Sequence, residues 1–118
     1  MNILCYWSCS KLCPCDQIED SEALALLELA VDADLVPAVM LDPKSLRPTQ
    51  DWLLAHMLQG LVDVEYTPAV FVIRFENELF IHDGHHRATR ALLDGQMVRA
   101  AVFDFHDINA ETAKRYEV

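Results

Sequence analysis

The chain has 118 residues, of which 53% are hydrophobic, and a formal net charge of −10 at pH 7. A single domain of this size can bury a core without disulfides or metals, and the composition is typical of a globular chain. No apolar run reaches the roughly 18 residues of a membrane-spanning helix, and the acidic charge disfavours duplex DNA as a partner while favouring a small ligand or a protein.

We expect residues 1–19 to form a cysteine-rich segment and residues 20–118 a single domain. The four cysteines are Cys5, Cys9, Cys13 and Cys15. Their C-x3-C-x3-C-x-C spacing is more compressed than the two separated pairs of a structural zinc site, so we expect reduced thiols, with metal or iron–sulfur binding as the alternative. The start MNILCYWSCSKLCPC lacks the basic flank and long apolar region of a secretory signal, which indicates a cytoplasmic protein.

The first predicted element is a helix within residues 20–34, DSEALALLELAVDAD. Asp20 or Ser21 can cap its first turn, because short polar side chains accept a hydrogen bond from the N–H groups at a helix start. The residues that share its apolar face are Leu24, Leu27 and Val31.

The next three segments are a strand, a loop and a second helix. Residues 36–42, VPAVMLD, predict a short strand, and Pro37 suggests a place at the edge of a sheet. Residues 43–49 predict a loop from their two prolines. Residues 50–62 predict a helix with Asp51 at its electropositive end. Its apolar stripe is Leu53, Leu54, Met57, Leu58 and Leu61.

The second half of the chain begins with a predicted β-hairpin. Its strands are residues 67–75 and 78–83, with the polar sequence ENE at the turn. Residues 85–95 then predict a helix that ends at Gly95, which stands in the usual position just past a last helical turn.

A strand over residues 97–105 and a short helix capped by Asn109 complete the chain. The predicted order is α-β-α-β-β-α-β-α. This order indicates an α+β domain with a small mixed β-sheet and packed helices.

Residues 80–95, FIHDGHHRATRALLDG, hold an aspartate, three histidines and two arginines beside a glycine, which is a high density of polar, protonatable side chains for the first turn of a surface helix. They predict a strand, a tight turn and a helix, with Gly84 at the turn because glycine permits a positive φ and a close approach of a ligand to the backbone. The first helical turn, expected at the surface, would form an anion site from its N–H groups and dipole. Arg87 would bind a phosphate with two hydrogen bonds, and His85 and His86 would donate hydrogen bonds or exchange protons near neutral pH.

Structural explanations exist for several of these residues. Asp83 could be only a helix cap, and His82 could be a core or surface histidine with its own partners. Arg90 and Asp94 are four apart and predict an exposed ion pair. A zinc site is a further alternative, although strand alternation separates His82 from Asp83. Its ligands would be His82, Asp83, His85 and His86, with His106 as a remote addition.

The segment LFIHDGHHRATRALLDG, preceded by a hairpin that begins TPAVFVIRF, resembles the conserved box of the ParB/sulfiredoxin superfamily. The segment LRPTQDWLLAHML is similar to the earlier part of such domains, so the resemblance covers roughly residues 36–105. It implies a ParB/sulfiredoxin-like fold in which this box binds nucleotide phosphates. Members include sulfiredoxin, CTP-binding chromosome-partition proteins, free-serine kinases and ParB-like nucleases.

The resemblance is carried over residue by residue. Gly84 matches the glycine of the box, and His86 with Arg87 matches the His-Arg pair of sulfiredoxin. His85 stands where sulfiredoxin has its catalytic cysteine and the partition proteins have glutamate. Thr89 stands where the partition proteins have a further arginine. Neither the sulfiredoxin reaction nor the CTP-driven clamp is therefore expected, and DGHHR is closer to the kinase-like and small members.

These observations predict a nucleotide-binding domain that acts as an ATP-dependent phosphotransferase or nucleotide hydrolase with Mg²⁺. The expected phosphate-binding residues are Gly84, His85, His86 and Arg87, and the candidate general bases are Asp83 and His85. One alternative is a non-catalytic acidic interaction or regulatory protein that retains the fold and binds a protein partner. Another is a ParB-like nuclease, for which only Asp83 is well placed as a metal-binding carboxylate.

Overall fold

The computed structural model describes residues 18–47 and 69–116. The helices in these ranges are α1 (Ser21–Asp32), α3 (His85–Leu93) and α4 (Ala110–Arg115). The strands are β1 (Val39–Leu41), β2 (Leu46–Arg47), β3 (Val70–Phe75), β4 (Glu78–Asp83) and β5 (Val98–Asp104), and the 3-10 turns are η2 (Pro43–Ser45) and η4 (Phe105–Asp107). The four cysteines and the helix expected at residues 50–62 lie outside the described residues.

The strands form one mixed sheet in the order β1-β5-β3-β4-β2. β3 and β4 form an antiparallel hairpin, β5 runs parallel to β3, β1 runs antiparallel to β5, and β2 runs parallel to β4. The hairpin turns at Glu76 and Asn77, whose φ values are 50° and 65°. Two successive positive φ angles match the right-handed twist of the strands, so the polar pair makes a tight turn without glycine. The predicted α+β class, mixed sheet and hairpin are confirmed.

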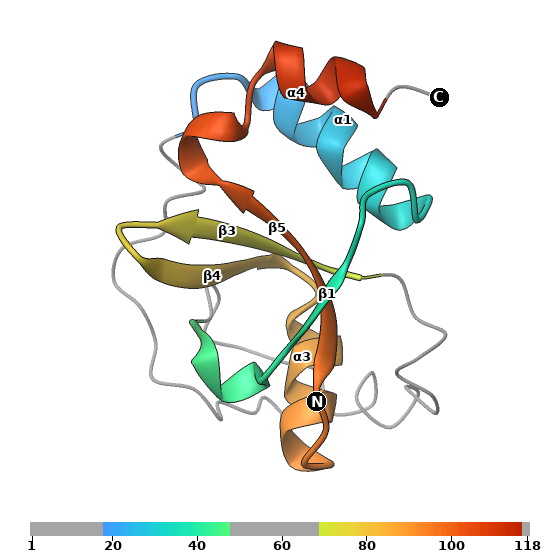
Figure 1. Cartoon of the computed structure of the whole chain (residues 1–118), viewed down its shortest axis with the longest axis vertical. Coiled ribbons are helices and arrows are strands. Elements are labelled where there is room, and N and C mark those ends of the chain that lie inside the picture. The colour runs from blue at the N-terminus through green and yellow to red at the C-terminus, as the bar shows by residue number, and fades with distance from the viewer. Residues whose placement is uncertain (1–17, 48–68, 117–118) are drawn as a thin grey trace, which may run out of the picture.

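Helices cover both faces of the sheet (Figure 1). On one face α1 and α4 contact each other and pack over Phe71 and Ile73 of β3. On the other face α3 packs over Val70 and Val72 of the same strand. Because successive side chains of a strand point to opposite faces, β3 contributes to both cores and is apolar almost throughout.

The predicted ends of three helices are confirmed. The Asp20 carboxylate accepts a hydrogen bond from the Ala23 N–H at 2.9 Å at the start of α1. The Asn109 side chain accepts one from the Thr112 N–H at 3.0 Å at the start of α4. Gly95 follows α3 with a φ of 66°. The Gln96 N–H donates to the Ala91 carbonyl at 2.9 Å, which is the hydrogen bond typical of a helix that ends at glycine.

The segment 43–49, predicted as a loop, contains more regular structure than its prolines indicated. Pro43–Ser45 forms a 3-10 turn, and Leu46 and Arg47 then pair in parallel with β4. Leu46 is only 3% exposed and packs into the core beneath α3, so burial of one apolar side chain holds this short strand in the sheet. Among the strands of residues 18–47 and 69–116, β1 ends the order, which is the edge position predicted for residues 36–42.

Candidate functional site

The candidate site lies where β4 ends and α3 begins. Gly84 alone joins Asp83, the last residue of β4, to His85, the first residue of α3. Its φ of 99° and ψ of 26° are left-handed, as expected for the turn residue. This conformation costs an L-residue roughly 1–2 kcal/mol, and glycine avoids that cost because it has no Cβ. A glycine is therefore what allows the chain to pass from strand to helix in a single residue.

The space beside Gly84 is filled by the protein itself. A Cβ at this position would lie 2.9 Å from Arg87 Nη2 and 3.1 Å from a Val70 methyl carbon. The missing side chain thus makes room for the guanidinium of the same chain. The approach of a ligand to this part of the backbone stays a prediction.

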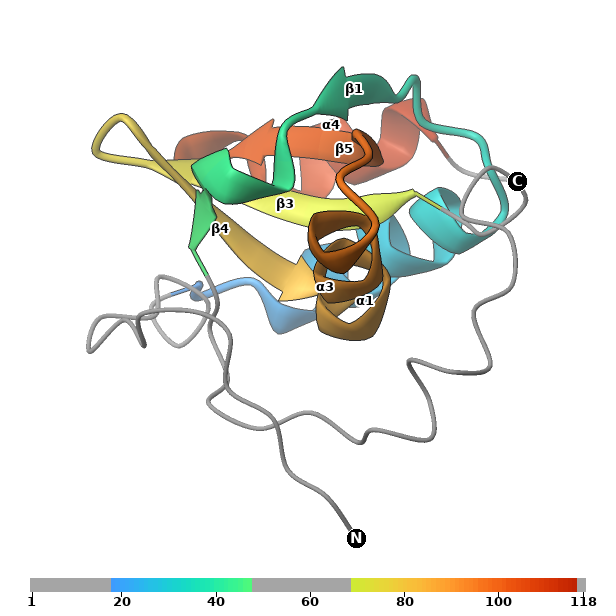
Figure 2. The same cartoon turned by 90° about the horizontal axis from the view of Figure 1, so that it is seen from below.

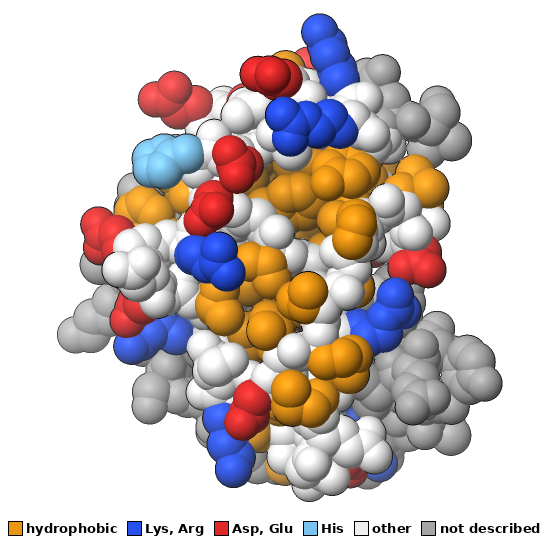
Figure 3. Space-filling model, viewed as in Figure 1, with side chains coloured by type: hydrophobic (Ala, Val, Ile, Leu, Met, Phe, Trp, Pro, Cys, Tyr) orange, Lys and Arg blue, Asp and Glu red, His pale blue; other side chains and the backbone are white. Residues whose placement is uncertain are grey.

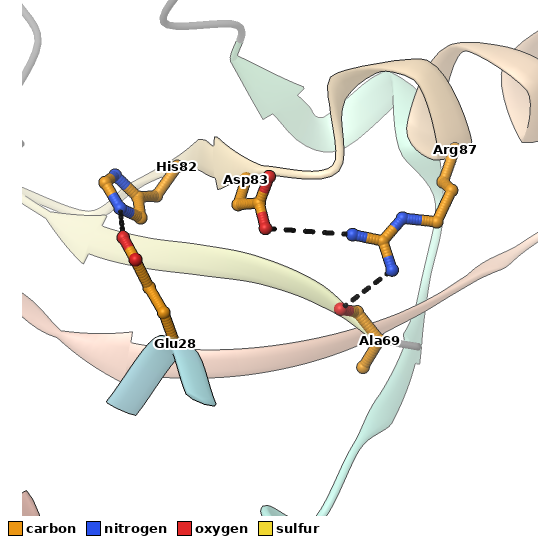
Figure 4. A network of polar contacts seen from close by, with 5 residues as sticks. All are labelled: Glu28, Ala69, His82, Asp83 and Arg87. Carbon is orange, nitrogen blue, oxygen red and sulfur yellow. Dashed lines mark hydrogen bonds and ion pairs between the residues drawn. The ribbon is translucent and has the colours of Figure 1, made fainter. Parts of the chain in front are cut away.

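Arg87 reaches back from α3 toward the ends of two strands (Figure 4). Its Nη1 donates to the Ala69 carbonyl at 3.5 Å, and its Nη2 lies 3.9 Å from the Asp83 carboxylate. Both distances are at the outer limit of their kind of contact, so each is weak. The Arg87 side chain is 14% exposed, against 56% for Asp83. The first helical turn is therefore not simply at the surface, because the guanidinium packs between the start of β3 and the end of β4.

His85 is buried, with 4% of the residue exposed. Burial lowers its pKa from 6.5 to about 4, the negative charge of Asp83 opposes this shift, and His86 and His82 add to it. His85 is consequently neutral near pH 7. The expectation that this imidazole exchanges protons near neutral pH is wrong, because protonation would place a positive charge in a poorly solvated position. His86 is partly exposed on the first turn of α3.

His82 belongs to a different contact network, on the face that α1 covers. Its imidazole Nε2 contacts the Glu28 carboxylate of α1, and its ring lies edge-on to Phe71 with 5.2 Å between ring centroids. The register shifts at this point: Phe71 pairs with Asp83 but Val72 pairs with Ile81, so His82 is an additional residue in a β-bulge. His82 and Asp83 therefore contact different helices, as alternation predicted, and His82 is a histidine with structural partners.

The remaining polar residues of this segment have distinct surroundings. Arg90 Nε donates to Asp94 at 3.0 Å with both side chains about one-third exposed, which confirms the predicted surface pair. Thr89 is fully buried on α3. Asp83 does not cap α3, because Gly84 is the N-cap residue and the Asp83 carboxylate faces Arg87 instead.

The zinc alternative required several histidines to converge. His106 lies in η4, with its ring 5.4 Å from that of Phe105. Within residues 18–47 and 69–116, no three His, Cys, Asp or Glu side chains come together in a way that could hold a metal ion. None of the helices described in these ranges is long and apolar enough to cross a bilayer.

Three contacts at this junction could not be found from the sequence. Glu28 is 54 residues before His82, and the Ala69 carbonyl is 18 residues before Arg87. Val70, which closes the space beside Gly84, reads in the sequence as an ordinary strand residue. Only the packing of α1 and β3 around the end of β4 brings these groups to the site.

Comparison with protein-family models, with curated proteins and with solved structures found no match for this chain. The geometry of the β4–α3 junction and the sequence resemblance over roughly residues 36–105 are therefore the basis for a function. That junction combines a left-handed glycine, a helix start and a mostly buried arginine beside an exposed carboxylate.

Proposed function

We propose that this chain binds the phosphates of a nucleotide at the β4–α3 junction, as a ParB/sulfiredoxin-like domain would. The observation that carries the proposal is the left-handed Gly84 between β4 and α3, which brings the Arg87 guanidinium against the start of a nine-residue helix. The positive end of a helix dipole and a guanidinium both favour an anion. Arg87 also offers a planar set of donors that fits phosphate geometry.

Two contacts of the Arg87 guanidinium are long for their kind. Its contact with the Ala69 carbonyl is to a neutral oxygen at 3.5 Å, and the Asp83 carboxylate is 3.9 Å away. A phosphate oxygen at the usual distance of about 2.8 Å forms a stronger, charge-assisted hydrogen bond. A bound phosphate would therefore interact with Arg87 more strongly than the Ala69 carbonyl does.

Asp83 is the better of the two candidate bases. Its side chain is 56% exposed, so a substrate hydroxyl or a water can reach it. His85 is buried, and its pKa of about 4 makes it a poor proton acceptor near pH 7. Mg²⁺ is commonly held by one or two carboxylates together with substrate phosphates, so Asp83 suits a Mg²⁺–nucleotide complex better than a permanent metal site. The chemistry supported is phosphoryl transfer or nucleotide hydrolysis.

Calorimetric titration with ATP, ADP and CTP in the presence of Mg²⁺ tests this proposal. Arg87→Ala is expected to weaken binding by roughly ten- to a hundred-fold, because one charge-assisted pair contributes about 1.5 to 3 kcal/mol. Arg87→Lys keeps the charge but loses the planar donor set, and is expected to fall between Ala and the natural residue.

Arg90→Ala is the matched control, since it removes an arginine of the same helix whose ion-pair partner among the described residues is the exposed Asp94. It is expected to leave affinity within about twofold. Equal losses in Arg87→Ala and Arg90→Ala would mean diffuse electrostatic attraction and would contradict the site. An absence of binding at millimolar nucleotide would refute the proposed function.

A non-catalytic interaction protein is the second candidate, favoured by the net charge of −10. An acidic protein of this size can cover a basic surface on a partner through complementary charge. Affinity capture from the native host separates the two candidates. A stoichiometric partner that is retained equally by Arg87→Ala would favour the interaction protein.

A further inference from the structure

Strand β1 lies at one edge of the described sheet, and two of its three side chains are exposed. Among the described strands it pairs with β5 alone, and Figure 2 shows it at the rim, away from α3. Val39 is 52% exposed and Met40 is 54% exposed. Val39 pairs with Ala100 and Met40 with Arg99, and paired residues share a face of the sheet. Because Val39 and Met40 are consecutive, apolar side chains are exposed on both faces of β1.

Further exposed apolar side chains adjoin this strand. Leu35, shortly before β1, is 44% exposed, and Met97, next to the Val98 that pairs with Leu41, is 48% exposed. Figure 3 shows hydrophobic side chains gathered along this face of the molecule, with charges of both signs around them. An apolar patch with a polar rim is typical of a protein–protein interface.

A hollow lies at the far end of the strand from Leu35. It has a volume of about 140 Å³ and is lined by residues that include Asp42, Pro43, Lys44 and Met97. The protruding Leu35 and this hollow thus stand at opposite ends of β1. An antiparallel copy of the strand would bring each Leu35 to the hollow of the other chain.

Charged side chains of opposite sign flank β1 at its two ends. Asp34 precedes the strand, is 65% exposed and pairs with Arg99, whereas Lys44 follows the strand and is exposed. In an antiparallel pair centred on Met40, Lys44 of one copy stands opposite Val36 of the other, two residues from Asp34. Pro37 and Pro43 are equally distant from Met40 and lack an N–H, so the added ladder is confined to residues 38–42. The paired segment is therefore short, and the prolines at its two ends stop the strand pairing from extending further.

We infer that β1 is a self-association surface, on which a second copy of this chain docks antiparallel, edge to edge, to form a two-fold dimer. Backbone hydrogen bonds continue the sheet across the axis, and Val39, Met40, Leu35 and Met97 supply the apolar contact. This inference does not depend on the proposed nucleotide site, because that site is formed by β4, α3 and the start of β3, and none of its residues belongs to β1.

Sedimentation equilibrium of the full chain under reducing conditions tests the inference. Over roughly a hundredfold range of concentration, the mass is expected to rise from 13.4 kDa toward twice that value. Added salt is expected to strengthen association, because it screens the repulsion between two chains of charge −10, and this outweighs the loss of the weak, exposed Lys44–Asp34 attraction. A basic peptide seated on the same edge would instead be released by salt.

Met40→Lys is expected to keep the chain monomeric, because it places two like charges at the two-fold axis. Leu29→Lys is the matched control: Leu29 is 65% exposed on α1, and its replacement is expected to leave association unchanged. Thermal unfolding of both variants verifies that they fold. A mass of 13.4 kDa at every concentration and salt level, or a dimer that persists in Met40→Lys, would overturn the inference.

Discussion

Acidification below pH 6.5 is expected to destabilise this fold through a single buried side chain, His85. In the unfolded chain this imidazole takes up a proton near pH 6.5, whereas in the folded chain its pKa is lowered to about 4 by burial. Between these values the unfolded state binds more protons than the native state. The free energy of unfolding therefore falls as the pH decreases through this window.

The magnitude follows from the two pKa values. A pKa depressed from 6.5 to about 4 corresponds to a loss of up to about 3 kcal/mol once the pH reaches 4. Only 4% of His85 is exposed, so solvent screens this effect little. The stability that neutral His85 preserves is fully present above pH 6.5 and is lost progressively toward pH 4. For a domain of this size, 3 kcal/mol is a large part of the total stability.

Urea unfolding at intervals between pH 7.5 and 4.5 measures this loss. His85→Gln, which does not titrate, is expected to flatten the profile between pH 6.5 and 4.5, although its stability at pH 7.5 also changes. His106→Gln, at an exposed position in η4, is expected to keep the profile of the natural chain. Profiles of the natural chain and His85→Gln that fall in parallel would refute the reasoning, since the loss would then come from carboxylates.

Three further outcomes are expected. Gly84→Ala should destabilise the fold by at least about 2 kcal/mol in urea unfolding, because a Cβ there is strained and meets other side chains. Gly95→Ala, with a φ of 66° and open space around the new Cβ, should cost about 1 kcal/mol. Equal losses in the two variants would contradict the packing described. Asp83→Asn should raise nucleotide affinity roughly fivefold in calorimetry without Mg²⁺, by removing about 1 kcal/mol of repulsion between the carboxylate and the phosphates. Any phosphate release with Mg²⁺ should fall in the same variant. Weaker binding without Mg²⁺ would contradict this repulsion. Asn109→Ala should lower stability by about 1 kcal/mol in thermal unfolding, because the α4 cap is lost, and should leave nucleotide affinity unchanged. A loss of affinity in this variant would mean that α4 influences the nucleotide site.

Local signals in this chain predicted most elements of the described fold. The caps Asp20 and Asn109, the terminating Gly95 and the polar hairpin turn act through neighbours a few residues away, so the sequence displays them directly. The short strand β2 was missed because two prolines mark its segment as a loop. Its place in the sheet depends on burial of Leu46, which is a tertiary contact.

At the β4–α3 junction the sequence by itself determined the identity and the order of the groups: a strand end, a glycine with positive φ, and a helix start with histidines and an arginine. Only the tertiary structure decided their surroundings. His85 is neutral at pH 7 because the folded chain buries it, and not because of its place in the motif. Likewise, α1 supplies the Glu28 carboxylate that contacts His82. The physical reason is that backbone conformation is set by near neighbours, whereas the solvation of a charge depends on segments that approach from far along the chain.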